Sequence, residues 1–215
     1  MHARRRWLTL VGAHVALAAL LLGAPVANAQ RQFAEGVAWV KLAHPQLPEP
    51  GSKIEVIEFF SYGCIHCYHL EEHIAAWATK LPVEVSFKRV PVFSTPFARL
   101  YYTIESLGRE DLNAKVFRAI HDERVMLQDE TVALAWLEQQ GIERTRLRDA
   151  WNAFALNAKI NRTRTLAGLY QLEATPSVIV DGKYRVTYAP GRLEMNQTAD
   201  VLAFLIAKAR SERVK

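Results

Sequence analysis

The sequence predicts an α/β protein, because short β-type segments stand on both sides of a long stretch with helical periodicity. Three observations support this prediction: a strand-helix-strand pattern in the first half of the chain, a helical middle, and a strand-strand-helix pattern near the C-terminus. The expected order is therefore β, β-α-β, helical block, β-β-α.

The first half begins with a short apolar stretch at 37–42, which we expect to be a leading strand. Residues 54–60, IEVIEFF, form a dense apolar run rich in aromatic and β-branched side chains, as is typical of a buried central strand. From 64 to 80 apolar residues recur at intervals of three and four, which predicts a helix, and residues 83–90 predict a second strand. The last three segments make a β-α-β unit.

The middle of the chain, up to about residue 172, contains no convincing strand pattern. Thr95 followed by Pro96 predicts a helix start, with Thr95 as the N-cap and Pro96 at the first helical position. Gly108 and Gly141 are the expected helix stops. The segments that suit amphipathic helices are 97–107, 112–121, 130–139, 145–154 and 156–170.

The last part of the chain returns to a period of two residues. We expect a strand at 177–180, a tight hairpin turn at 181–182 and a partner strand at 184–187. A final helix is expected from 193 to about 210.

The N-terminus has the layout of a secretory signal peptide. Three arginines at 4–6 precede a mostly apolar run at 7–24, and residues 27–29, Ala-Asn-Ala, form an A-x-A cleavage site, so we expect the mature chain to begin at Gln30. An uncleaved membrane anchor is the alternative, because a span needs about 20 apolar residues. Without the three arginines the formal net charge falls from +5 to +2, so the basic composition gives no reason to expect nucleic-acid binding.

Cys64 and Cys67 are the only cysteines of the chain, and they lie in the stretch FFSYGCIHCYHLEE. Three uses compete for such a pair: a structural disulfide, half of a metal site, or a redox centre. Secreted proteins usually employ cysteines as structural disulfides, but this loop is too short to gain much from closure. His66, His69 and His73 are further possible metal ligands, yet no distant cysteine completes a zinc site. We therefore favour the redox use and expect no metal.

A redox role requires a reactive thiolate. Cys64 falls where the strand gives way to the helix, so its sulfur should meet the free N–H groups of the first turn and the positive end of the helix dipole. His66 can add a hydrogen-bond donor or a positive charge. Cys67, one turn further into the helix, should be less exposed. We expect Cys64 to be the attacking sulfur and Cys67 the resolving one.

Glu58 is an acid inside an otherwise core-like strand, six residues before Cys64. A buried carboxylate is costly unless it is paired, and burial raises its pKa. Either Glu58 lies at an edge of the sheet or on the surface, or it is a proton acceptor beneath the cysteines. Lys88, on the neighbouring predicted strand, is a candidate partner for its carboxylate.

Thr175-Pro176 stands at the head of a predicted strand, where a proline cannot donate to the ladder. An ordinary trans edge proline is one explanation. The other is a cis proline whose preceding residue, Thr175, offers its backbone N–H and C=O to an extended substrate peptide next to the sulfur.

Taken together, EFFSYGCIHCYHLEE, the long helical block and ATPSVIVDGKY resemble the DsbA family of periplasmic thiol:disulfide oxidoreductases. The resemblance covers most of the mature chain and is strongest at 54–72 and 174–185. It implies a thioredoxin fold with an all-helical domain inserted between its two halves. The implied division is a cleaved signal peptide at 1–29, thioredoxin parts at 30–94 and 173–215, and a helical insertion at 95–172.

The resemblance also implies roles for the site residues. They are Cys64 as the nucleophile, Cys67 as its buried partner in a redox-active disulfide, Glu58 as the buried acid, and Thr175-Pro176 as the substrate-binding cis-proline loop.

The dipeptide between the cysteines departs from the family pattern. The usual pair is Pro-His, and here it is Ile65-His66. The histidine, taken as the main thiolate stabiliser in that family, is present, whereas Ile65 leaves the oxidising strength open. Because groups that stabilise the reduced thiolate make the disulfide a stronger oxidant, we expect electrons to flow from substrates to this protein.

The expected function is therefore a dithiol oxidase that donates its Cys64–Cys67 disulfide to reduced, newly secreted proteins in the periplasm of a Gram-negative bacterium. The resemblance implies a quinone-linked membrane reoxidant of the DsbB type and no cofactor. Isomerases of this kind carry a dimerisation module, and because no segment looks like one we expect a monomer. A reductase or isomerase on the same fold is one alternative, and a non-enzymatic metal or peptide carrier is another.

Overall fold

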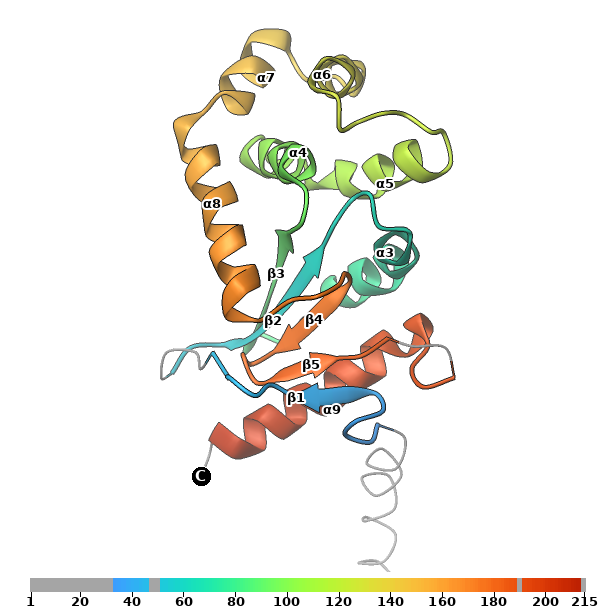
Figure 1. The fold of residues 1–215 in the computed structure, drawn as a ribbon, viewed down its shortest axis with the longest axis vertical. Coiled ribbons are helices and arrows are strands. Elements are labelled where there is room, and N and C mark those ends of the chain that lie inside the picture. Colours follow the sequence, from blue (N-terminus) through green and yellow to red (C-terminus); the bar gives the residue numbers. More distant parts are fainter. Residues whose placement is uncertain (1–32, 47–50, 189–190, 214–215) are drawn as a thin grey trace, which may run out of the picture.

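The computed structural model describes residues 33–46, 51–188 and 191–213 (Figure 1). The expected signal peptide and its cleavage before Gln30 lie outside these residues. Within the described ranges, no helix is both long and apolar enough to cross a membrane.

A five-stranded mixed sheet forms the centre of the molecule, in the order β1-β5-β4-β2-β3. Strand β2 is an interior strand that pairs with β3 in parallel and with β4 antiparallel, while β5 pairs antiparallel with both β4 and β1. The expected order of elements along the chain is confirmed. The strands are β1 (Trp39–Lys41), β2 (Ile54–Phe60), β3 (Val85–Pro91), β4 (Ser177–Val180) and β5 (Tyr184–Val186).

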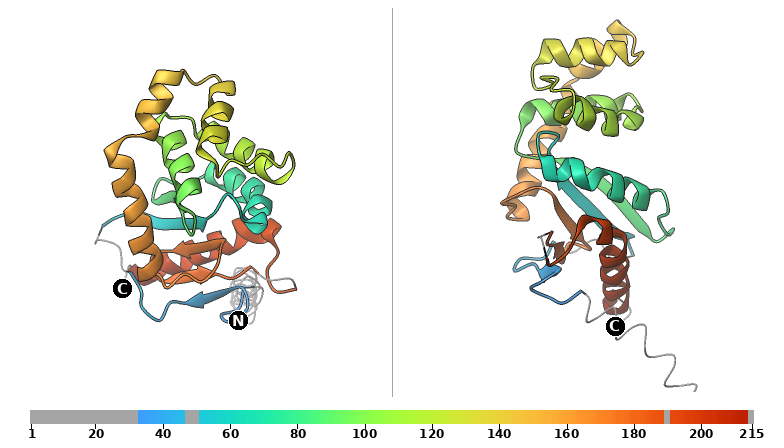
Figure 2. Two further views of the ribbon diagram at one scale, coloured as in Figure 1. Left: turned by 45° about the horizontal axis from the view of Figure 1, so that its top comes forward. Right: turned by 90° about the vertical axis from the view of Figure 1, so that its right-hand side faces the viewer.

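Helices cover both faces of this sheet (Figures 1 and 2). On one face, α3 (Ile65–Ala78) and α9 (Thr198–Arg213) bury Leu70 and Ile74 in a core shared with alternate residues of β2 and β4. On the other face, the C-terminal end of α8 (Phe154–Leu169) packs against a smaller core that includes Ile57. Because side chains alternate along β2, consecutive residues of this strand enter different cores.

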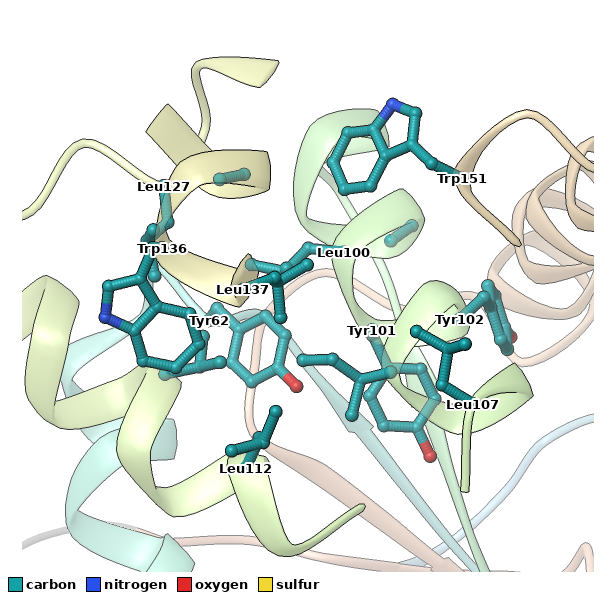
Figure 3. Close-up of a cluster of buried hydrophobic side chains, with 14 of the residues drawn as sticks. Tyr62, Leu100, Tyr101, Tyr102, Leu107, Leu112, Leu127, Trp136, Leu137 and Trp151 are labelled. Carbon is teal, nitrogen blue, oxygen red and sulfur yellow. The ribbon is translucent and has the colours of Figure 1, made fainter. Parts of the chain in front are cut away.

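The helices that follow one another between β3 and β4 lie mostly beyond the C-terminal ends of β2 and β3, and α8 returns from there to the sheet (Figure 1). They enclose a large apolar cluster that reaches Tyr62, just ahead of the cysteine pair (Figure 3). How the chain divides into domains at 94/95 and 172/173 stays a prediction. The elements of this block are α4 (Thr95–Ser106), η1 (Glu110–Leu112), α5 (Asn113–His121), α6 (Glu130–Gln139), α7 (Arg144–Trp151) and α8.

The predicted cap of α4 is wrong by one residue. Ser94, not Thr95, is the N-cap, and its hydroxyl accepts a hydrogen bond from the backbone N–H of Phe97. The helix starts at Thr95, so Pro96 is its second residue. Either position tolerates proline, because the first N–H groups of a helix have no intrahelical acceptor.

Other differences from the sequence-based expectation concern element ends. Val83 is exposed and precedes β3, which begins at Val85 because the parallel pairing to β2 starts at Ile54. The turn between β4 and β5 has three residues, 181–183, rather than two. The last helix, expected from 193, begins with the 3-10 turn η2 (Met195–Gln197) and then continues as α9.

Candidate active site

The two cysteines lie at the start of α3, as expected. Cys64 has an extended backbone conformation and is the N-cap residue, and Ile65 begins the helix. Cys64 is half-buried, whereas Cys67, one turn further on, has an exposed fraction of 0%. Both are thiols in this structure. One sulfur is therefore accessible to another molecule and the other is enclosed.

The surroundings of Cys64 favour its thiolate form. A hydrogen bond with the Cys67 thiol, helped by the Thr175 side chain and by the backbone N–H groups of Cys67 and His66, lowers the pKa of the Cys64 thiol to about 5. Partial burial opposes this effect. An N-cap position places the sulfur beside N–H groups that have no other acceptor, which explains the backbone contributions.

Cys67 is shifted in the opposite direction. Its hydrogen bond with Cys64 and its burial raise the pKa of the Cys67 thiol far above the ordinary value, and negative charge on Cys64 and Glu58 adds to this. At neutral pH the reduced pair therefore carries one proton and one negative charge, and the surroundings favour the charge on Cys64.

Glu58 is buried, with an exposed fraction of 1%, so the edge or surface alternative is excluded. Its carboxylate accepts a hydrogen bond of 2.9 Å from Nε of Arg89, and the same guanidinium lies 2.8 Å from the carboxylate of Glu71 on α3. Burial raises the pKa of Glu58 to about 7, with Arg89 opposing the rise and the negative charge of Glu71 adding to it. Two buried carboxylates thus share one cation.

The suggested pairing of Glu58 with Lys88 is wrong. Lys88 lies opposite Ile57 in the β2–β3 ladder, and its ammonium pairs with Glu55 at 2.6 Å on the same face of the sheet. Glu58 lies opposite Arg89. Adjacent residues of a strand point to opposite faces, so only Arg89 can reach the buried carboxylate.

The Thr175-Pro176 peptide bond is cis, as predicted, and it leads directly into β4. The carbonyl oxygen of Thr175 lies 3.3 Å from Sγ of Cys64. Segments more than a hundred residues apart therefore meet at the reactive sulfur, and Thr175 presents its backbone there.

His66 is exposed, and its side chain lines a groove next to the Thr175-Pro176 loop rather than the sulfur. No hydrogen bond joins its imidazole to Cys64 among the described residues, and its backbone N–H is the group that acts on the thiolate. The further lining residues of this groove include His69, His73 and Glu194.

Gly63, between the end of β2 and the start of α3, is a supporting residue. A Cβ atom at this position would come within 2.8 Å of the Phe97 ring, which packs at the edge of the apolar cluster beside Cys64. On the following turn, the Tyr68 hydroxyl donates a 2.6 Å hydrogen bond to Asp122 just beyond α5. These contacts fix the helical block against the start of α3.

Among the described residues, no group of three or more His, Cys, Asp or Glu side chains is arranged to hold a metal ion.

A model of the DSBA-like thioredoxin domain family matches residues 69–203. Curated relatives include the thiol:disulfide interchange protein DsbA of Burkholderia cepacia, 34% identical over 84% of this chain and 88% of that protein. The chain belongs to the DsbA family. The DsbA of Bordetella pertussis is 37% identical over 78% of the chain and 83% of that protein. The chain is accordingly a thiol:disulfide oxidoreductase.

Solved DsbA structures show the same fold. The crystal structure of Pseudomonas aeruginosa DsbA superposes with a TM-score of 0.76 and 33% identity, covering 84% of this chain and 96% of that one. The oxidoreductase NmDsbA1 of Neisseria meningitidis gives a TM-score of 0.74 at 26% identity, covering 85% and 96%. The thioredoxin fold with helices inserted in it, expected from the sequence, is confirmed.

At the cysteine pair, the match to the family model and the geometry of the site are independent observations. The matched region of the family model begins at His69, after both cysteines. The roles of Cys64 and Cys67 therefore rest on their positions at the start of α3 and on their opposite pKa shifts.

Proposed function

We propose that this protein is a periplasmic dithiol oxidase that passes its Cys64–Cys67 disulfide to reduced, newly secreted proteins. The observation that carries the proposal is the contrast between the two sulfurs: the pKa of Cys64 is lowered to about 5 and that of Cys67 is strongly raised. A stabilised Cys64 thiolate lowers the free energy of the reduced pair, which makes the disulfide form the stronger oxidant.

The proposed reaction proceeds by two exchange steps. A substrate thiolate attacks Sγ of Cys64, the S–S bond to Cys67 breaks, and the leaving sulfur of Cys67 takes up a proton. A second substrate thiolate then attacks the substrate sulfur of the mixed disulfide, and Cys64 leaves as thiolate. The substrate gains a disulfide, and this protein gains the two electrons. A thiol of low pKa leaves fastest, which suits Cys64 for the second step.

Glu58 is the proposed source of the proton for Cys67. Its pKa of about 7 lets the carboxyl group hold a proton at neutral pH and release it readily, as general acid–base catalysis requires. Its negative charge raises the pKa of Cys67, so the two groups affect each other electrostatically. During reoxidation, when Cys67 must lose its proton, the same carboxylate is the acceptor.

Thr175 and Pro176 are the proposed substrate edge. The Thr175 backbone lies beside Sγ of Cys64, where an extended peptide could add as a further strand while its cysteine reaches that sulfur. We further propose that the protein acts as a monomer, without a cofactor, and that a quinone-linked membrane protein of the DsbB type reoxidises it.

Thiolate absorbance tests the proposal. In the C67S variant, which isolates Cys64, we expect a thiolate titration well below that of a free thiol, whose pKa is about 8.5. The C64S variant should show no thiolate at neutral pH. A Cys64 titration near the free-thiol value would exclude the oxidase and favour a reductase.

The His66→Ala variant separates the two contributions of His66. If its backbone N–H is the main contribution, the redox equilibrium of the Cys64–Cys67 pair with glutathione should change little. A large shift toward a weaker oxidant would assign the effect to the imidazole, as the sequence analysis expected.

A further inference from the structure

The groove beside the Thr175-Pro176 loop has a volume of about 670 Å³. It lies between α3 and the segment that leads from β5 into α9, and Thr175, which contacts Cys64, forms part of its lining. A reduced segment that delivers its cysteine to Cys64 would have flanking residues in or near this groove. The groove can therefore influence which substrates react.

One wall of the groove consists of three histidines from α3: His66, His69 and His73. Their spacing of three and four residues places them on one face of the helix. His66 and His69 are exposed and His73 is half-buried. In the described part of the chain, no hydrogen bond or ion pair occupies any of these imidazoles. Two other polar side chains of α3 are occupied, with Glu71 bound to Arg89 and Tyr68 to Asp122.

The facing wall includes the apolar side chains of Leu193 and Met195 together with Glu194. The Glu194 carboxylate accepts a 3.0 Å hydrogen bond from the backbone N–H of Gly191, and it caps the 3-10 turn η2. The Glu194 carboxylate is thus hydrogen-bonded within its own loop rather than to the histidines.

Few other charged or titratable groups lie near this wall. Glu72 neighbours His73 on α3 but does not line the groove. On the α5 side, Asp122 is bound to Tyr68. Tyr188 lines the groove and its hydroxyl is paired with Thr198. Glu173 and Arg192 are exposed and adjoin the lining residues Ala174 and Leu193, but they do not line the groove themselves. In the oxidised protein Cys64 carries no thiolate, and Glu194 is the acid among the lining residues.

We propose that this histidine wall makes the groove selective for reduced segments that carry a carboxylate side chain beside the reacting cysteine, and that the preference grows as the pH falls from 8 to 6. Histidine is the side chain that ordinarily gains its charge in this range, and a protonated imidazole with no partner attracts a carboxylate. The inference rests on the proposed function, because it concerns the substrates of the same reaction.

The expected size is modest because the groove is open to solvent. We expect about a threefold to tenfold preference at pH 6, the size that one or two exposed ion pairs produce, and little preference at pH 8. Salt should weaken the preference, because exposed charges are screened.

The test uses two dithiol peptides that differ only in one residue next to the reacting cysteine, Glu in one and Gln in the other. The readout is the ratio of their kcat/KM values with the oxidised protein at pH 6, 7 and 8, in the presence of a metal chelator. Titration of Cys64 or Glu58 alters both rates alike and cancels in the ratio. A ratio that rises toward low pH supports the proposal, and a ratio that stays at one overturns it.

Variants locate the effect. The triple variant H66Q/H69Q/H73Q should lose the pH-dependent preference, whereas H44Q, at an exposed histidine after β1 that does not line the groove, should keep it. Glu194→Gln should strengthen the preference by removing the opposing carboxylate. Retention of the preference in H66Q/H69Q/H73Q would overturn the proposal. If neither peptide is oxidised, the result contradicts the proposed function itself. If both peptides are oxidised with equal kcat/KM, the result contradicts only the proposed selectivity.

Discussion

Two buried carboxylates at different positions on the same sheet, those of Glu58 and Asp181, differ in the number of cations that bind them. Glu58, in β2, shares the single guanidinium of Arg89 with a second acid, Glu71. Asp181, in the turn after β4, is bound by two cations, Arg213 and Lys183. The exposed fractions of Glu58 and Asp181 are 1% and 0%, so burial alone does not distinguish them.

The difference lies in the local balance of charge. Near the cysteines there are two acids for one base, which leaves a carboxyl group able to hold a proton, with a pKa of about 7. At the turn, Asp181 contacts two bases, and the nearby acid Glu212 reaches only one of them, Lys183, at 3.7 Å. Arg213 also binds the backbone carbonyl of Ser52. The second cluster ties the end of α9 to the sheet. The comparison indicates that the end of the sheet near the cysteines is distinguished by an excess of buried acid over base, and four variants test that conclusion.

Removing Arg89 should have the largest effect. Arg89→Met leaves Glu58 and Glu71 buried without a cation, and loss of one partner of a buried ion pair typically costs about 3–5 kcal/mol of unfolding free energy. The loss should diminish at pH 5, where the carboxyl groups can be protonated. Denaturant unfolding at pH 8 and pH 5 measures it.

The matched control is Lys88→Met, the adjacent residue of β3. Lys88 pairs only with the partly exposed Glu55, so its removal should change the unfolding free energy by less than about 1 kcal/mol. Equal losses in the two variants would contradict the account of the Glu58 cluster.

Glu58→Gln should change how stability depends on pH. Because the pKa of Glu58 is raised to about 7 from 4.5, the folded state holds this proton more firmly than the unfolded state. Wild-type stability is therefore full below about pH 4.5 and falls as the pH rises through 7, by about 3 kcal/mol in total. The variant should lack this decline and should also exchange disulfides more slowly. Unfolding curves from pH 5 to 8 that run parallel for both proteins would disprove the assignment.

Asp181→Asn should destabilise the protein without affecting its chemistry. Arg213 and Lys183 would keep only backbone acceptors and Glu212, which lies 3.7 Å from Lys183. We expect a loss of about 1–3 kcal/mol in unfolding free energy, the cost of a buried group left without its partner. The Cys64 thiolate titration should remain as in the wild type, and a shift in it would show that the two clusters are coupled.

The smallest expected effect is that of Glu71→Gln. The substitution removes a negative charge that raises the pKa of Glu58, and it leaves one acid, Glu58, with one base, Arg89. The pKa of Glu58 should fall, with a change in unfolding free energy within about 1 kcal/mol. Carbon-13 NMR titration of the Glu58 carboxyl measures it, with Glu72→Gln, an exposed neighbour on α3, as the control. An unchanged Glu58 titration in E71Q would refute the charge-balance explanation.

Much of the fold could be predicted because local signals agreed with one another. The run IEVIEFF, the break at Gly63 and the helical spacing that follows correspond to β2 and α3 within two residues. The difference in exposure between Cys64 and Cys67 could be predicted from the same local pattern, because Cys64 stands at the helix start and Cys67 lies one turn further into the helix. The cis bond before Pro176 was predictable from the break in pattern and from the resemblance together.

The partners of Glu58 could not be predicted, because they depend on strand register. Lys88 and Arg89 are adjacent bases, and the sequence does not state which one faces the acid. A shift of one residue in the β2–β3 pairing would exchange them. Glu71 was hidden for a similar reason, since an acid on a helix is normally solvent-exposed and only the packing of α3 against the sheet turns it inward. The three histidines of α3 could be recognised in the sequence. The groove that they line could not, because its other side is formed by the loop before α9.

The order of strands in the sheet also constrains how the protein can fold as it is made. Strand β2 pairs with β4 through Val56 and Val180, so the ladder beside the reactive cysteines closes only after every helix of the block has been synthesised. The α4–α8 helices rely on nearer neighbours in the chain, and such local contacts form faster than pairings between distant segments. A growing chain can thus contain Cys64 and Cys67 for a long interval before Thr175 reaches the sulfur, and the completed site is a late event in its biosynthesis.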